Sequence, residues 1–158
     1  MDRVGQLAER YVRHVLGNHK PDSEVIYAGV FLDSMARKKL LGAFPPEHAT
    51  LHAHHMTVWH FRDGGGEPEL PWGKTVSLKV VGHFADGRAQ AVIVDVPSIL
   101  RPRGRVPHVT LSTSDGVGPA ASNDLLPTSW DRVKGMVAIK GKVGWMDAHE
   151  RVHLNPPS

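Results

Sequence analysis

The stretch TVSLKVVGHFADGRAQAVIVDV, residues 75–96, decides which fold class is expected for this chain. Residues 75–85 and 89–96 are rich in Val and other strand-forming residues, and Asp86-Gly87 separates them. An Asp-Gly dipeptide between two such runs is typical of a tight turn between paired strands. The stretch therefore predicts an antiparallel hairpin near the middle of the chain.

Further strands are expected on both sides of this hairpin. Apolar and β-branched residues predict strands over 24–32, 53–60, 106–112 and 135–146. Helical signals are fewer. Apolar spacing predicts a helix over 2–17, and Asp33 or Ser34 can cap a second helix that ends at Phe44, before Pro45-Pro46. A loop or short helix is expected over 118–126. This order of elements predicts an α+β domain.

Length and composition limit the remaining possibilities. The 158 residues fit one domain over 1–158, with its core in 24–146 and a flexible tail at 154–158. The absence of cysteine excludes disulfides, thiolate metal centres and a cysteine nucleophile. The longest apolar run is too short to cross a bilayer, and the N-terminus lacks a signal pattern, so we expect a cytoplasmic protein that has no membrane partner. A net charge of +3 is too small to indicate nucleic-acid binding by itself.

The pattern of His, apolar residue, Ser or Thr, apolar residue occurs three times, whereas composition predicts about 0.2 occurrences by chance. The matches begin at His48, His55 and His108. On a strand, His55 and Thr57 point to one face while Met56 and Val58 point to the other, and His108-Val-Thr-Leu alternates in the same way. His48 follows the Pro-Pro break, before any clear strand, so we interpret its match as accidental.

Two such strands, facing each other across a cleft, would place imidazoles on opposite sides of a phosphate. One neutral histidine can take a proton from an attacking water while the other, protonated, donates one to the leaving oxygen. The hydroxyls of Thr57 and Thr110 can bind the non-bridging phosphate oxygens. The sequence thus predicts His55 and His108 as catalytic residues, with Thr57 and Thr110 as phosphate ligands and no cofactor or metal.

These paired motifs resemble those of the two-histidine (2H) phosphoesterase superfamily. The stretches Phe44-Pro-Pro-Glu-His, His54-His-Met-Thr-Val, Pro107-His-Val-Thr-Leu and Ser122-Asn-Asp-Leu-Leu are similar to the cyclic phosphodiesterase domain of fungal tRNA ligase and its bacterial relatives. The resemblance covers residues 24–146. It implies a bilobal α+β fold, in which antiparallel sheets flank a central cleft and helices lie outside, and hydrolysis of a 2′,3′-cyclic phosphate to a 2′-phosphate.

The resemblance also sets expectations for roles and partners. The catalytic set of the family corresponds by position to His55, Thr57, His108 and Thr110. We favour His55 as the acid and His108 as the base, although the motif leaves both assignments open. The substrate would be the 2′,3′-cyclic phosphate of an RNA end or a nucleotide. RNA ligase or kinase partners would be separate proteins, since this chain has no room for those domains. Cyclic oligonucleotides, 2′,5′ linkages and a catalytically silent RNA-binding module remain alternatives.

Other residues are weaker candidates for substrate contacts. Ser112 shares the expected face of Thr110, while Arg105 and Lys74 could attract phosphate or be solvated charges. Trp72 could stack on a base. A metal site is also conceivable, because four histidines lie close together in the sequence at positions 52, 54, 55 and 60. Strand alternation places His55 on the face opposite the other three, and no carboxylate has a recognisable ligand spacing, so no metal site is predicted.

Overall fold

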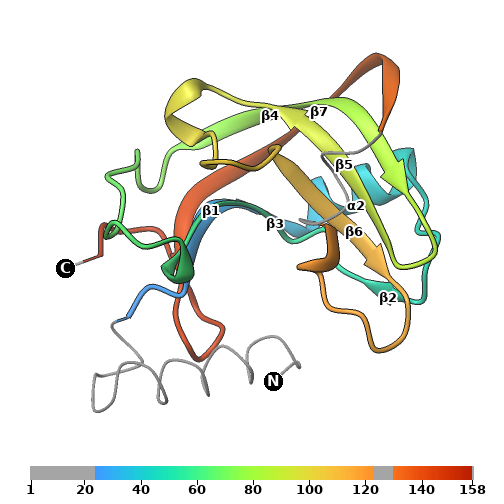
Figure 1. Cartoon of the computed structure of the whole chain (residues 1–158). Coiled ribbons are helices and arrows are strands. Elements are labelled where there is room, and N and C mark those ends of the chain that lie inside the picture. The colour runs from blue at the N-terminus through green and yellow to red at the C-terminus, as the bar shows by residue number, and fades with distance from the viewer. Residues whose placement is uncertain (1–23, 123–129, 158) are drawn as a thin grey trace.

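Six antiparallel strands form a closed barrel, whose arrangement can be followed in Figure 1. A computed structural model describes residues 24–122 and 130–157. The strands neighbour one another in the order β1-β3-β6-β5-β4-β7, and β1 also pairs with β7, which closes the sheet. They are β1 (Tyr27–Leu32), β3 (His55–His60), β4 (Thr75–Ala85), β5 (Ala89–Asp95), β6 (His108–Thr113) and β7 (Asp131–Met146). Closure leaves these strands few unpaired edges.

The hairpin predicted for residues 75–96 is confirmed as β4 and β5. The backbone N–H of Asp86 donates to the Ala89 carbonyl at 3.0 Å. The Asp86 carboxylate accepts hydrogen bonds from the backbone N–H groups of Arg88 and Ala89, which fixes the turn. The four other predicted strands are also present, but β7 starts at Asp131, four residues before the expected Gly135.

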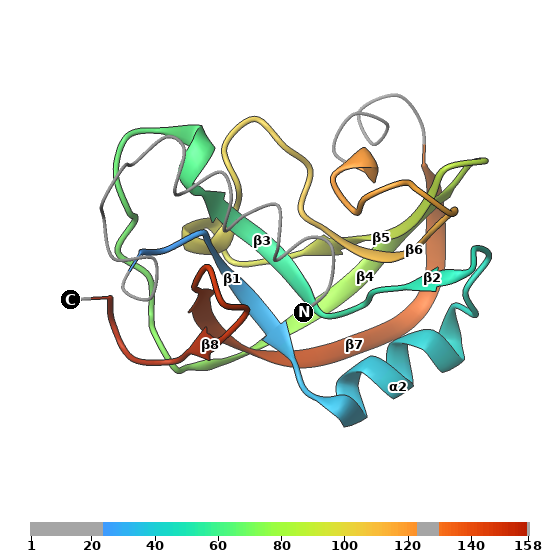
Figure 2. The same ribbon diagram turned by 90° about the horizontal axis from the view of Figure 1, so that it is seen from below.

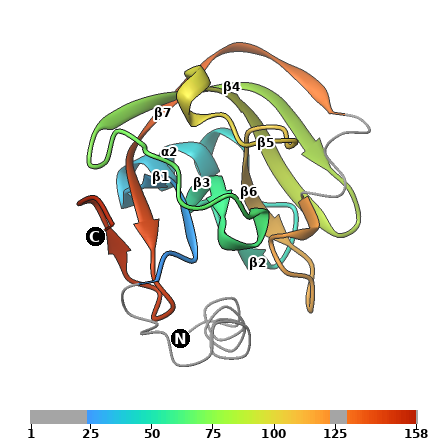
Figure 3. The same ribbon diagram turned by 60° about the vertical axis from the view of Figure 1, so that its left-hand side comes forward.

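Two short strands were not predicted. β2 (Thr50–Leu51) pairs with β6, and β8 (Val152–His153) pairs with the end of β7. Figure 3 shows β8 beside β7 near the C-terminus. Two residues are too few for an alternating pattern to be visible in a sequence. Beyond β8, the Trp145 indole N–H donates to the Asn155 carbonyl at 2.9 Å, so this residue of the expected flexible tail is anchored.

The interior of the barrel forms the main hydrophobic core. Residues from every barrel strand contribute to it, including Met56, Val109, Leu78, Val92 and Val143. Helix α2 (Ser34–Ala43) lies beside β7 (Figure 2) and adds Ala36 and Leu40 to this core.

The start of α2 is as predicted. Asp33 is its N-cap, and the Asp33 side chain accepts a hydrogen bond from the Ala36 N–H at 2.8 Å. Two single-turn 3₁₀ helices, η2 (Phe61–Asp63) and η3 (Ser98–Leu100), lie in the connections. The helix expected over 2–17 lies outside the described residues, as do residues 123–126 of the loop or short helix expected over 118–126.

The α+β class is confirmed. The described strands do not form the two separate sheets that we expected to flank a cleft. They form one continuous closed sheet. The physical reason is that β1 pairs with β3 along one edge and with β7 along the other. Within residues 24–122 and 130–157, no helix has the length and apolar character needed to cross a bilayer.

Candidate active site

The two predicted motifs lie side by side on neighbouring strands. Met56 of β3 pairs with Val109 of β6, and both side chains are fully buried in the barrel core. Strand alternation then places the flanking residues of each motif on the outer face of the barrel. On this face, His55 and Thr57 of β3 lie next to His108 and Thr110 of β6.

The antiparallel register gives these four residues a local two-fold relationship. A two-fold axis through the Met56–Val109 pair maps His55 onto His108 and Thr57 onto Thr110, because antiparallel neighbours run in opposite directions. Each histidine therefore lies opposite a threonine, and the two histidines occupy one diagonal. Diagonal neighbours across antiparallel strands are about 7–8 Å apart.

All four side chains line a cavity of about 930 Å³. Its lining also includes Tyr27 and Phe31 of β1, His60 and Arg105. Our expectation that the two motif strands face each other across a cleft is wrong, since β3 and β6 are paired in the same sheet. The two imidazoles nevertheless reach a common space.

His55 is held among aromatic rings. Its ring centroid lies 4.5 Å from that of Tyr27 and 5.7 Å from that of Phe31. The His55 Nδ1 atom is buried and has no hydrogen-bond partner among the described residues. Burial, reinforced by the neighbouring His54, His108 and His52, lowers the pKa of His55 from 6.5 to about 3. Without a bound anion, His55 is therefore neutral near pH 7.

His108 has a defined ring orientation. Its Nδ1 atom lies 2.8 Å from the Val106 carbonyl oxygen. Because a carbonyl only accepts hydrogen bonds, this contact assigns the proton to Nδ1 and leaves Nε2 with a lone pair. Burial lowers the pKa of His108 and Arg105 adds to this, whereas the bond to Val106 opposes it. A neutral imidazole whose Nε2 can accept a proton has the form required of a general base.

The two threonines occupy the other diagonal of the site. Thr57 and Thr110 are half-buried and line the cavity. The Thr110 hydroxyl lies 3.1 Å from the Ser122 Oγ atom and 3.4 Å from the Pro119 carbonyl oxygen. Ser122, which the family resemblance singled out, is thus a hydrogen-bond partner of Thr110. Its expected companions Asn123 to Leu126 lie outside the described residues.

The prediction that His55 lies on the opposite face from the three neighbouring histidines is wrong. His52, His54 and His60 line the same cavity as His55. Regular alternation fails at two places: Ala53 has a positive φ of 61°, and the register between β1 and β3 shifts at Ala28/Gly29. Among residues 24–122 and 130–157, however, no three His, Cys, Asp or Glu side chains are grouped so that they could hold a metal ion.

The weaker candidates separate into two groups. Arg105 lines the cavity, where its guanidinium lies 2.8 Å from the Asp63 carboxylate. The other three do not line it. Lys74 is exposed on the surface, Trp72 packs against the hydrophobic core, and Ser112 is fully buried.

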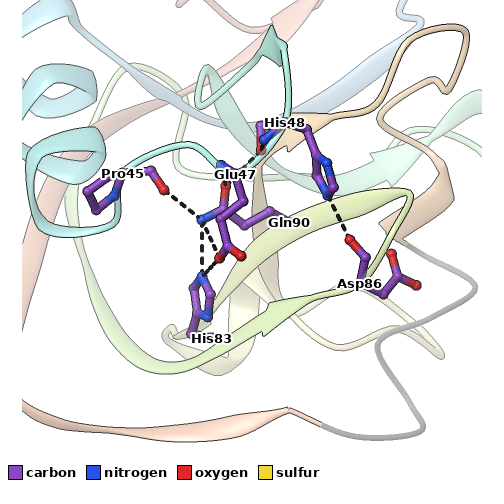
Figure 4. A network of polar contacts seen from close by, with 7 residues as sticks. Pro45, Glu47, His48, His83, Asp86 and Gln90 are labelled. Atoms are coloured by element: carbon purple, nitrogen blue, oxygen red, sulfur yellow. Dashed lines mark hydrogen bonds and ion pairs between the residues drawn. The ribbon is translucent and has the colours of Figure 1, made fainter.

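Ser112 belongs to a network centred on Gln90 (Figure 4). The Ser112 hydroxyl donates to the Gln90 Oε1 atom at 2.7 Å, and the backbone N–H of Glu47 donates to the same oxygen at 3.0 Å. The Gln90 amide also donates to the Pro45 carbonyl at 3.1 Å. These bonds fasten the segment between α2 and β2 to the sheet. We did not predict this role for Gln90, because a lone Gln on a strand carries no sequence signal.

His48, the third pattern match, lies beside the Gln90 network (Figure 4). Its Nε2 atom lies 2.7 Å from the Asp86 carbonyl oxygen (Figure 4), and it does not line the cavity. The structure therefore separates His48 from the other two motif histidines. This agrees with the interpretation that its match is accidental.

Comparison with known proteins leaves the family of this chain open. The chain matches no model of a known protein family, and a comparison with curated proteins finds no significant match.

Proposed function

We propose that this protein is a metal-independent phosphodiesterase that hydrolyses the 2′,3′-cyclic phosphate of RNA ends or nucleotides to a 2′-phosphate. The observation that carries the proposal is the two-fold arrangement around the Met56–Val109 pair. It brings two imidazoles and two hydroxyls to one cavity. Two proton-transfer groups and two phosphate ligands are the side chains that such a reaction requires.

In the proposed reaction, His108 acts as general base. Its Nε2 atom takes a proton from water as the water oxygen attacks phosphorus, and the Nδ1 bond to Val106 holds the ring in the required tautomer. The bond between phosphorus and the ribose 3′ oxygen breaks. His55 donates a proton to that oxygen, which leaves a 2′-phosphate and a 3′ hydroxyl.

The acid role requires His55 to be protonated in the complex. Its low pKa in the free protein arises mainly from burial, with no carboxylate among the causes. An anionic phosphate bound beside the ring favours the charged imidazolium and raises this pKa. The substrate would therefore supply the charge that makes His55 an acid, while Thr57 and Thr110 bind the non-bridging oxygens.

Membership of the 2H superfamily belongs to this proposal. It is supported by the paired motifs and their two-fold relation, whereas a bilobal shape is not part of the support. A cytoplasmic location and separate RNA ligase or kinase partners are further expectations of the same proposal. The alternatives are cleavage of cyclic oligonucleotides or 2′,5′ linkages, and a silent RNA-binding module.

The test uses a nucleoside 2′,3′-cyclic phosphate with and without EDTA. We expect turnover that survives EDTA and falls at least about 100-fold in His55→Ala and in His108→Ala, because general acid–base groups contribute rate factors of this size. His48→Ala is the matched control, since it removes a pattern histidine that does not line the cavity, and it should retain full activity.

Three results would contradict the proposal. Loss of turnover on chelation would indicate a metal-dependent reaction. Unchanged activity in both variants would show that neither histidine takes part in the reaction. RNA binding with no turnover of cyclic, 2′,5′-linked or cyclic oligonucleotide substrates would favour the silent module.

A further inference from the structure

The two motif histidines are oriented in different ways. A backbone carbonyl fixes the ring of His108, since the His108 Nδ1 atom lies 2.8 Å from the Val106 oxygen. The buried Nδ1 atom of His55 has no hydrogen-bond partner among the described residues, and the His55 ring lies against the rings of Tyr27 and Phe31. The orientation of His55 therefore depends on the residues that hold these aromatic rings.

A small hydrophobic cluster beside the main core holds Tyr27. Ile26 and Ala148 are its buried members, and Tyr27 and Phe61 pack against them. These residues come from the start of β1, from the turn between β7 and β8, and from η2. The backbone N–H of Ile26 donates to the Met146 carbonyl at 2.9 Å, and the N–H of Phe61 donates to the Ile26 carbonyl at 3.0 Å. The cluster thus joins three segments of the chain at the aromatic side of the cavity.

The turn that contributes Ala148 is closed by Asp147. The Asp147 Oδ1 atom accepts hydrogen bonds from the backbone N–H groups of His149 at 2.8 Å and Arg151 at 3.0 Å. The Oδ2 atom lies 2.9 Å from the Arg151 Nε atom and 2.8 Å from the His153 Nε2 atom. The Asp147 side chain is fully buried, so a single carboxylate joins the turn to β8.

The same turn and β8 form one wall of the cavity, which Asp147, Glu150 and Val152 line. Strand β8 shares two register pairs with β7, and the His153 ring stacks on the Trp145 ring with centroids 4.0 Å apart. Hydrogen bonds to a carboxylate are stronger than those between neutral groups. The Asp147 carboxylate is therefore the main polar fastening of this wall.

We propose that Asp147 is a positioning residue for His55. Its carboxylate fixes the turn, the turn places Ala148 in the cluster that holds Tyr27, and the Tyr27 ring orients the His55 imidazole at a centroid distance of 4.5 Å. The consequence for catalysis rests on the proposed function, in which His55 has to reach the leaving oxygen. Rates are sensitive to such placement, because a shift of about 1 Å costs about 100-fold.

The experiment compares Asp147→Asn with Asp86→Asn in the full chain. Asp86 is the matched control, because its carboxylate also accepts two backbone N–H groups in a turn between strands, but it does not line the cavity. Asn retains one oxygen acceptor and loses the negative charge. Thermal unfolding verifies that each variant is folded. Ala148→Gly is a second variant, which removes the methyl group from the cluster and keeps the carboxylate, so the test stands even if Asp147→Asn does not fold.

The first measurement is the contact between the two rings. Nuclear Overhauser effects between the Tyr27 and His55 rings should weaken in Asp147→Asn and in Ala148→Gly and stay unchanged in Asp86→Asn. The second measurement is steady-state kinetics with a nucleoside 2′,3′-cyclic phosphate. We expect kcat to fall about tenfold in Asp147→Asn with KM within twofold of wild type, because the orientation of an acid acts in the transition state.

A double-mutant cycle tests the path through Tyr27. Tyr27→Ala removes the ring through which Asp147 acts, so the addition of Asp147→Asn should lower kcat less than about twofold further. If the two effects instead multiply, Asp147 acts independently of Tyr27 and the proposal is wrong.

Three other results would overturn the positioning role. A change in KM alone would assign Asp147 to the electrostatics of the cavity. Equal losses of kcat in the two Asn variants would be a general effect of weakening a turn. An unchanged contact between the rings would remove the link to His55.

Failure of this role is distinguishable from failure of the proposed function. Turnover by the wild-type protein, with the ring contact and kcat unchanged in Asp147→Asn, would leave the activity intact and reject the role of Asp147. A weakened ring contact in Asp147→Asn, in a protein that turns over no cyclic phosphate, would retain the role of Asp147 in orienting His55 and contradict the proposed function.

Discussion

Met56 and Val109, the central residues of the two His-x-Thr motifs, are register partners across β3 and β6. Both are fully buried, so the pair anchors the two motifs in the barrel core. The same pair determines which side chains are neighbours on the outer face. A slip of one residue in this register would turn one motif away from the cavity. The candidate site therefore depends on the packing of two side chains that take no part in its chemistry.

Thr57→Val and Thr110→Val should each lower kcat about 100-fold and leave KM within a few-fold of wild type. The reason is that a preorganised donor to developing oxyanion charge contributes mainly in the transition state. Steady-state kinetics with a nucleoside 2′,3′-cyclic phosphate would measure this. Thr50→Val is the matched control, because Thr50 is exposed on β2 and does not line the cavity. A rise in KM with unchanged kcat would assign the threonines to ground-state binding only.

His55→Phe should abolish turnover and yet stabilise the fold by about 1–2 kcal/mol at pH 7. A phenyl ring can keep the packing against Tyr27 and Phe31, and it removes the buried Nδ1 atom, which has no hydrogen-bond partner among the described residues. Urea unfolding would measure the change. His108→Phe should instead destabilise, because it leaves the Val106 carbonyl without its partner. Destabilisation by His55→Phe at pH 7 would contradict this account of His55.

Stability should fall as the pH is lowered from 7 to 5. In the unfolded chain His55 takes up a proton near pH 6.5, whereas in the folded protein it does so only near pH 3. The unfolded state therefore binds more protons between these values, which destabilises the fold. At 1.36 kcal/mol per pH unit, the loss from His55 alone is about 2 kcal/mol at pH 5.

His55→Phe serves as the control for this pH dependence, since it lacks the titrating group but retains His60 and His108. The free energies of unfolding of the two proteins, measured in urea at several pH values, should diverge as the pH falls below 6.5. Parallel curves would show that burial of His55 does not set its protonation.

Ser112→Ala should lower stability by about 1–2 kcal/mol and leave kcat and KM unchanged. Ser112 bonds to Gln90 in the buried network and does not line the cavity. Gln90→Leu should cost more, about 3 kcal/mol, because it leaves several buried polar groups without partners. Chemical denaturation and steady-state kinetics would measure the two effects. A loss of kcat in folded Ser112→Ala would show that Ser112 contributes to the active site.

The sequence alone determined most of the elements. Six strands, the Asp86-Gly87 turn and the Asp33 cap of α2 follow from local rules, and all were predictable. Each depends on alternation, turn chemistry or capping within a few residues. The same local rules identified the two His-x-Thr motifs and correctly separated their core-facing residues from their outward-facing ones.

Apart from the β4–β5 hairpin, which the Asp86-Gly87 turn predicts, tertiary structure decided which strands became neighbours. Pairing of strands that are distant in the sequence is a non-local choice, made by burial of apolar faces, and no short pattern encodes it. It placed β3 beside β6 in one closed sheet, where the motif suggested two sheets across a cleft. It also brought His52, His54 and His60 to the cavity of His55, through the backbone of Ala53 and an irregular register. The candidate catalytic residues were visible in the sequence. Their convergence on one cavity required the packing of the whole barrel.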